Sequence, residues 1–165
     1  MKTFTIIFLI VLLSATTLAQ TTFTLPEMTD VQKHQLATAY CYNNIITAIN
    51  FAKSKGFTVE EYAKFCGEQF KNNETNYTQF VNSFLYAWVS FAENPEILSQ
   101  TENKIIISAK HVYPYLENVG TLWNVSFKEL ITWLGTIYEP ICENIGCTFK
   151  MEITNEGVIT TIEKK

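Results

Sequence analysis

Hydrophobic residues recur at intervals of three and four positions along most of the chain, which is the spacing of one helix face. The first stripe predicts a helix from Val31 to about Ser54, with Asp30 as its cap and with apolar positions at Leu36, Tyr40, Cys41, Ile45, Ala48, Ile49 and Ala52. Gly56 follows at the place where such a helix would stop.

Two later helices are predicted to begin with a capping box, in which a Ser or Thr is followed three residues later by Glu. Thr58 and Glu61 form the first box, and Ser126 and Glu129 form the second. The second helix is expected to run to Gly146. Pro140 lies inside it and should kink it, because proline removes one backbone hydrogen bond and crowds the preceding turn.

The most apolar helical stripe lies between these two boxes. It predicts a central helix from Tyr77 to about Glu93, with apolar positions at Phe80, Val81, Phe84, Leu85, Trp88, Phe91 and Ala92. Asn94 and Pro95 then resemble a new cap and a first-turn residue, so we expect a short helix through Leu98.

The segment from Lys104 to Val112 fits two structures. Its three consecutive isoleucines suit a short buried strand, but the same run also fits a helix that Pro114 would end. We favour the helix, and we expect residues 119–124 to form a loop.

Near the C-terminus the spacing of hydrophobic residues changes from three or four positions to two. Phe149, Met151 and Ile153 alternate with polar residues, and Val158, Thr160 and Ile162 do so again after the turn residues Asn155, Glu156 and Gly157. This alternation predicts a β-hairpin over residues 148–163 with one apolar face. The expected fold is therefore α+β and mainly helical, with about five helices and a C-terminal hairpin packed on them.

The N-terminus has the three parts of a secretory signal peptide in order. Lys2 supplies the positive charge, Ile6 to Leu13 is an unbroken apolar run, and Thr17 and Ala19 place small residues before Gln20. We expect residues 1–19 to be removed and residues 20–165 to form one domain that is exported to the periplasm or secreted. The apolar run is too short for a membrane span of about 20 residues, so no stable span is expected in the mature chain.

The composition limits the classes of partner that the protein is expected to bind. With 47% apolar and 14% aromatic residues, the chain has enough hydrophobic content to fold. Its formal charge is −4, all twelve basic residues are lysine, and loss of Lys2 with the signal would make it one unit more negative. Because phosphate recognition relies on arginine and on dense positive charge, we expect no nucleic-acid partner.

Export would place the four cysteines in an oxidising compartment, where disulfides are permitted. The cysteines are Cys41, Cys66, Cys142 and Cys147. A local Cys142–Cys147 disulfide would clamp the last helix to the hairpin. A Cys41–Cys66 disulfide is less natural, because the two residues stand at unequal distances from the turn that joins their helices.

No pattern indicates a catalytic residue, a metal ligand or a cofactor. Histidine occurs only at His34 and His111, and the cysteine and histidine spacings do not match a zinc site. One catalytic alternative stays open, a hydrolase in which Cys66 is the nucleophile and His34 or His111 is the base.

One short resemblance appears near the C-terminus. The passage from a helix through Gly146 into the segment Cys147 to Glu152 resembles the end of vinyl-reductase-type and haem-NO-binding-like domains. Cys142 and Cys147 stand closer together than in those domains, and their upstream strands are missing, so this resemblance assigns no site residue.

The most suggestive feature is the surplus of aromatic residues. Rings on several helices would line a pocket suited to a flat or apolar ligand. We therefore predict a non-enzymatic binding module for an apolar or aromatic small molecule, with Trp88, Phe84, Tyr138 and Trp133 as ligand-binding residues. A domain of the cell envelope that is structural or binds a protein, with no pocket, is the other alternative.

Overall fold

In the computed structural model, residues 28–165 are described; the expected signal segment, residues 1–19, lies outside them. The order of elements is α2 (Asp30–Ser54), α3 (Val59–Phe70), α4 (Tyr77–Phe91), β1 (Glu93–Gln100), β2 (Lys104–His111), α5 (Pro114–Val119), β3 (Thr121–Leu122), β4 (Val125–Ser126), α6 (Phe127–Ile137), α7 (Glu139–Ile145), β5 (Cys147–Thr154) and β6 (Gly157–Lys164). The expected α+β, mainly helical fold is confirmed. The domain boundary at residue 20 stays a prediction.

The main sheet has four strands in the order β1-β2-β6-β5, and every neighbouring pair is antiparallel. The predicted C-terminal hairpin is its β5–β6 half. On the central strands, Ile105 lies opposite Ile162 and Ala109 lies opposite Val158, and all four side chains are buried. One face of the sheet therefore forms the floor of the core.

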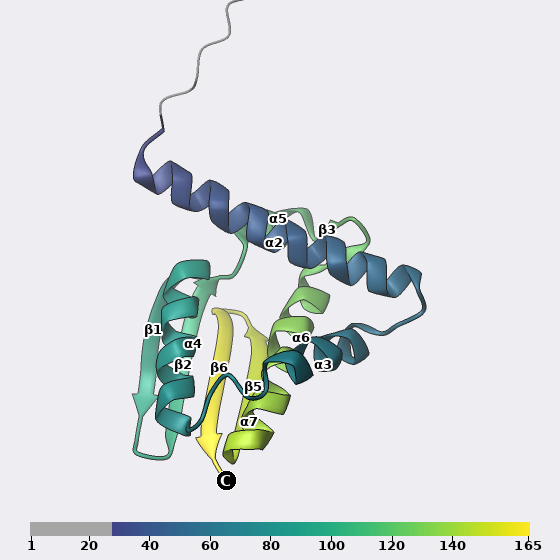
Figure 1. The fold of residues 1–165 in the computed structure, drawn as a ribbon. Helices are drawn as coiled ribbons and strands as arrows, with labels where there is room; N and C mark the ends of the chain where they lie inside the picture. The colour runs from purple at the N-terminus through teal and green to yellow at the C-terminus, as the bar shows by residue number, and fades with distance from the viewer. Residues whose placement is uncertain (1–27) are drawn as a thin grey trace, which may run out of the picture.

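Helices cover this face (Figure 1). α4 crosses the sheet in front of β1 and β2, while α6 and α7 lie against β5. α3 packs against α6 and α7, and the long helix α2 crosses the end of the sheet opposite the C-terminus. The core lies between the sheet and these helices.

Two predictions of helix were wrong. The segment after Asn94 forms strand β1, and the three isoleucines from Ile105 to Ile107 lie in strand β2. Pro95 is tolerated because β1 is an edge strand, where a missing backbone N–H breaks no ladder. This edge also carries Glu93, Glu96 and a register shift after Ile97, all of which discourage pairing with another chain.

Several boundaries differ from those predicted. The cap of α2 is Thr29 rather than Asp30, because the Thr29 hydroxyl accepts from the Gln32 backbone in a capping box. Pro114 begins α5 instead of ending a helix. The expected loop at 119–124 contains strand β3, which turns tightly into β4. Pro140 does more than kink a helix, because the chain divides into α6 and α7 at Tyr138.

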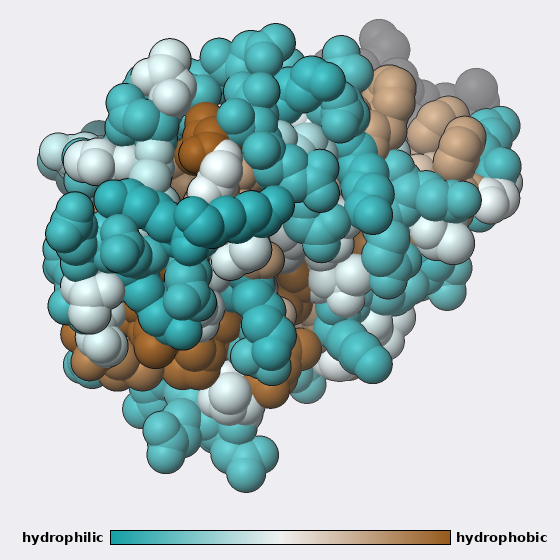
Figure 2. Space-filling view, turned by 90° about the horizontal axis from the view of Figure 1, so that it is seen from below, coloured by the Kyte–Doolittle hydropathy of each residue, from teal (hydrophilic) through white to brown (hydrophobic). Residues whose placement is uncertain are grey.

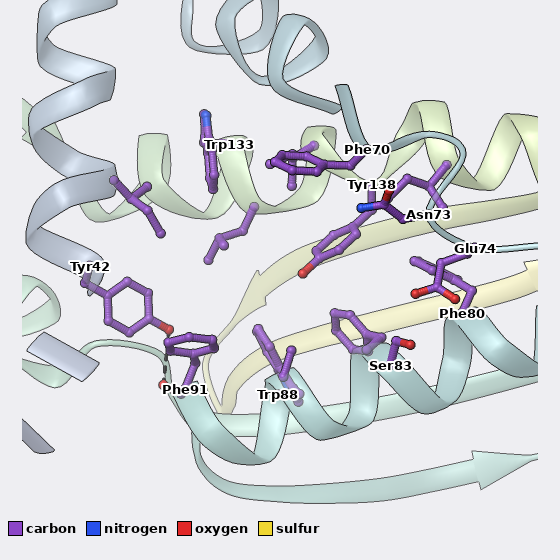
Figure 3. A pocket seen from close by; sticks show the side chains of 16 residues that line it. Tyr42, Phe70, Asn73, Glu74, Phe80, Ser83, Trp88, Phe91, Trp133 and Tyr138 are labelled. Atoms are coloured by element: carbon purple, nitrogen blue, oxygen red, sulfur yellow. Dashed lines mark hydrogen bonds between the residues drawn. The ribbon is translucent and has the colours of Figure 1, made fainter. Parts of the chain in front are cut away.

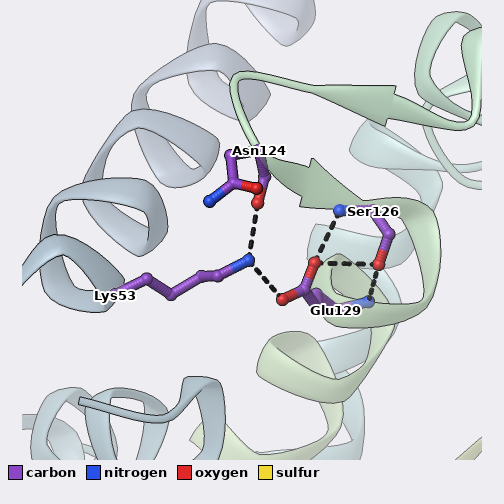
Figure 4. A network of polar contacts seen from close by, with 4 residues as sticks. All are labelled: Lys53, Asn124, Ser126 and Glu129. Carbon is purple, nitrogen blue, oxygen red and sulfur yellow. Dashed lines mark hydrogen bonds and ion pairs between the residues drawn. The ribbon is translucent and has the colours of Figure 1, made fainter. Parts of the chain in front are cut away.

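A polar network fixes the end of α2 to the start of α6 (Figure 4). Lys53 Nζ lies 2.5 Å from the Asn124 carbonyl oxygen and 2.5 Å from Glu129 Oε1. Glu129 in turn accepts from the Ser126 backbone N–H at 2.7 Å as part of the capping box. Burial alone would raise the pKa of Glu129, but the hydrogen bonds from Lys53 and Ser126 outweigh it and lower that pKa.

The end of the molecule that carries the C-terminus has a mostly hydrophilic surface, with hydrophobic residues gathered along one side (Figure 2). Lys164 and Lys165 close the chain there, and the polar turn Thr101–Asn103 joins β1 to β2 at the same end.

Candidate functional site

A cavity of about 370 Å³ lies between α4 and α6. Its volume falls within the range of ligand pockets, about 300–1,000 Å³. The cavity is lined by Tyr42, Ile45, Phe70, Asn73, Glu74, Phe80, Ser83, Phe84, Ala87, Trp88, Phe91, Trp133, Leu134, Ile137, Tyr138 and Ile141. Eight of these side chains are aromatic, so the wall is mostly ring surface.

The wall formed by α4 follows from its sequence spacing. Phe80, Phe84 and Trp88 stand four residues apart, on one face of the helix, and their exposed fractions are only 2–4%. The ring of Phe84 stacks on Trp88 with centroids 5.3 Å apart and meets the edge of Tyr138 at 5.5 Å. These contacts hold the rings in fixed orientations without filling the space beside them.

The opposite wall comes from α6 and from the break that follows it. Trp133 and Ile137 lie on α6, and Tyr138 is the residue between α6 and α7. α3 approaches this break closely at Gly67, where a Cβ would overlap the Ile137 carbonyl oxygen and press on the Pro140 ring. A glycine is therefore required at this position for the wall to keep its shape.

Tyr42 of α2 closes one end of the cavity. Its hydroxyl donates to the Phe91 carbonyl oxygen at 3.1 Å, and its ring stacks on Tyr113 with centroids 4.8 Å apart. Burial raises the pKa of Tyr42 and also that of Tyr138, so both phenols are neutral at physiological pH. Phe70 and Phe91 are partly exposed, which marks them as the rim.

Three polar residues of the lining lie at the other end (Figure 3). Asn73 and Glu74, from the loop between α3 and α4, gather there with Ser83. Four buried side-chain atoms of the described residues lack a hydrogen-bond partner, and three belong to lining residues: Glu74 Oε2, Trp88 Nε1 and Trp133 Nε1. A buried group without a partner costs about 1–3 kcal/mol. Three of these four atoms therefore lie at one cavity.

All four residues predicted to bind a ligand, Trp88, Phe84, Tyr138 and Trp133, line this single cavity. Ligand binding by them stays a prediction. Sequence reasoning missed Tyr42, Phe70 and Glu74. Tyr42 had a usable signal, because it stands one helical turn before the predicted apolar position Ile45. Glu74 had none, because it lies in a polar segment between helices.

Cys142 and Cys147 are both buried free thiols at the junction of α7 and β5. The proximity of the two thiols raises the pKa of Cys142, as burial also does, and lowers the pKa of Cys147. The predicted disulfide between them stays a prediction.

The residues of the catalytic alternative have other partners. Cys66 lies near Tyr62 on α3, and burial together with this neighbouring thiol raises the pKa of Tyr62. His111 Nδ1 lies 2.7 Å from Glu117 Oε2, and His34 is exposed on α2. Among residues 28–165, no three His, Cys, Asp or Glu side chains are close enough together to hold a metal ion.

Comparison with protein-family models, with curated proteins and with solved structures finds no match. Within the described part of the chain, no helix combines the length and the apolar character needed to cross a membrane.

Proposed function

We propose that this protein is an exported, non-enzymatic binding module that holds an apolar or aromatic small molecule in the cavity between α4 and α6. The observation that carries the proposal is the cavity itself, which is ring-lined and about 370 Å³ in volume. A concave, mostly apolar space of this size with a few polar groups at its wall is typical of small-molecule sites.

The distribution of unpartnered polar atoms supports the proposal. The indole N–H groups of Trp88 and Trp133 lack acceptors, although both side chains are at least nine-tenths buried. Ligand pockets are typically apolar with a few polar groups that orient the ligand.

The cavity also separates this proposal from its alternatives. An envelope domain that is purely structural gains nothing from an aromatic cavity, whereas a hydrolase needs a base in hydrogen-bond reach of its nucleophile. The partners of Cys66 and His111 give no support to a hydrolase. Export follows from the expected signal at residues 1–19 and is part of the proposal.

Isothermal titration calorimetry with 2-naphthylmethanol tests the proposal, because this probe is flat, neutral and mostly apolar. At about 0.3–0.6 kcal/mol per non-hydrogen atom, a ligand of twelve such atoms binds with a Kd between about 5 µM and 2 mM. We expect one site per chain and a negative heat-capacity change from apolar burial. Absence of saturable binding by this probe and by a set of similarly sized neutral aromatic compounds would contradict the proposal.

A further inference from the structure

The lining of the cavity contains one charged group, and that group is acidic. Glu74 lies in the loop between α3 and α4, is half-buried, and leaves its Oε2 atom buried without a hydrogen-bond partner. The other lining residues of the described chain are uncharged, and no lysine or histidine is among them. A site for a fatty acid or another anion would need the opposite charge.

The acid stands at one end of the ring-lined space. Figure 3 shows the Glu74 carboxylate near Phe80 and Ser83, whereas Tyr42 and Phe91 lie at the opposite end of the lining. A ligand that fits this arrangement has a flat apolar body among the rings and a single polar group directed toward the loop.

The aromatic rings near Glu74 also favour a positively charged group on the ligand. Phe80 and Tyr138 line the cavity with ring centroids 5.8 Å apart. The face of an aromatic ring attracts a cation, and a carboxylate that lacks a partner accepts strong hydrogen bonds from an ammonium group. Both effects are stronger in a partly buried site than in water, because less solvent screens the charges.

We propose that the ligand of this cavity is an aromatic or otherwise apolar amine, whose ammonium group binds the Glu74 carboxylate while its apolar body lies between α4 and α6. This inference rests on the proposed function, since it names the class of ligand that the same cavity takes.

Three probes with one naphthalene body test the inference: 2-naphthylmethylamine, 2-naphthylmethanol and 2-naphthoic acid. They are titrated at pH 7 into the wild type, into Glu74→Gln and into the matched control Glu102→Gln. Glu102 is an exposed acid in the β1–β2 turn that does not line the cavity, so its replacement removes the same net charge elsewhere.

In the wild type, the amine should bind at least about tenfold more tightly than the carboxylate, the scale of one charge-assisted hydrogen bond. In Glu74→Gln this ratio should fall below about threefold, and the neutral alcohol should lose less affinity than the amine, because it makes no ion pair with Glu74. Glu102→Gln should keep the wild-type ratio. A circular dichroism spectrum and a Tm like those of the wild type show that the Glu74 variant is folded.

Equal affinities for amine and carboxylate in the wild type would overturn the inference, as would a ratio that survives Glu74→Gln or falls equally in Glu102→Gln. Those outcomes leave the alcohol bound and the proposed function intact. If the alcohol and the amine both fail to bind, the proposed function itself is wrong.

Discussion

Filling the cavity from Ala87 should make the protein more stable and a weaker binder at the same time. Ala87 is a half-buried lining residue on α4. Leucine adds three carbon atoms, and full burial of each is worth about 0.8 kcal/mol, or about 2.4 kcal/mol together. Incomplete burial and about 0.5–1 kcal/mol of lost side-chain entropy reduce the expected gain to about 1 kcal/mol.

Thermal unfolding of Ala87→Leu, followed by circular dichroism, should show a Tm raised by about 3 °C, the scale of 1 kcal/mol in a domain of this size. Calorimetry with 2-naphthylmethanol should show at least tenfold weaker binding, because the new side chain occupies the space. Ala37→Leu, at an exposed position of α2, is the matched control and should change stability by no more than about 0.5 kcal/mol.

Two results would refute this reasoning. If Ala87→Leu lowers the free energy of unfolding by more than about 1 kcal/mol while Ala37→Leu does not, the cavity has no room for three carbon atoms. If the variant binds the probe as tightly as the wild type, the probe occupies another place on the protein.

Three further predictions concern the frame around the cavity. The variant Lys53→Met should lose about 1 kcal/mol at pH 7, because the partly buried Glu129 carboxylate loses its cation. Since the folded state lowers the pKa of Glu129, this contribution is complete above the ordinary Glu pKa, about 4.3, and is lost as the pH falls through the lower folded value. Urea titrations at pH 7 and pH 3 should therefore show a difference between variant and wild type that shrinks in acid; a difference that grows in acid contradicts the assigned pair. Gly67→Ala should lower the free energy of unfolding by about 1–3 kcal/mol and weaken probe binding, because its Cβ would displace the Ile137 carbonyl from the cavity wall. The control Gly135→Ala should not destabilise α6, because its Cβ meets only an ordinary contact. Equal Tm values for both variants would rule out the close approach at Gly67. With oxidised glutathione as the oxidant, Cys142 and Cys147 should form a disulfide worth about 2 kcal/mol for so short a loop. Peptide mapping by mass spectrometry should find these two cysteines joined, and alkylation of both after denaturation would disprove the disulfide.

Helix positions could be predicted where sequence periodicity and capping agree. The capping boxes at Thr58 and Ser126 both form as expected, and the stripe of Phe80, Phe84 and Trp88 is the buried face of α4. These signals are local, because each depends on residues within one or two turns of the helix.

The strands β1 and β2 could not be predicted with the same rules. Ile105 and Ile107 face the core, but Ile106 between them points to the other face and is also apolar, so the alternation typical of a strand is hidden. Asn94 and Pro95 suit a helix start locally, yet Asn94 adopts a φ of 49° and the chain turns into an edge strand. This region is stabilised as strands because β1 pairs with β2 and β2 pairs with β6, which lies far away in the sequence.

The cavity could be predicted in part. Its rings come from apolar helix stripes that are visible in the sequence, and Tyr138 lies beside the proline that breaks the helix. The place of Glu74 in the lining could not be predicted, because a polar loop residue is expected to face solvent. Only the tertiary fold brings it to the rings. The same holds for Gly67, whose role depends on the approach of α3 to α6.

The indole region of a ¹H–¹⁵N spectrum tests the central claim most directly, because the chain has three tryptophans. Trp88 and Trp133 line the cavity, whereas Trp123 is 51% exposed in the turn between β3 and β4. The three signals can be assigned by single replacements with phenylalanine. On saturation with 2-naphthylmethanol, the signals of Trp88 and Trp133 should shift and that of Trp123 should not. A shift of Trp123 alone, or of no indole at saturation, would contradict ligand binding between α4 and α6.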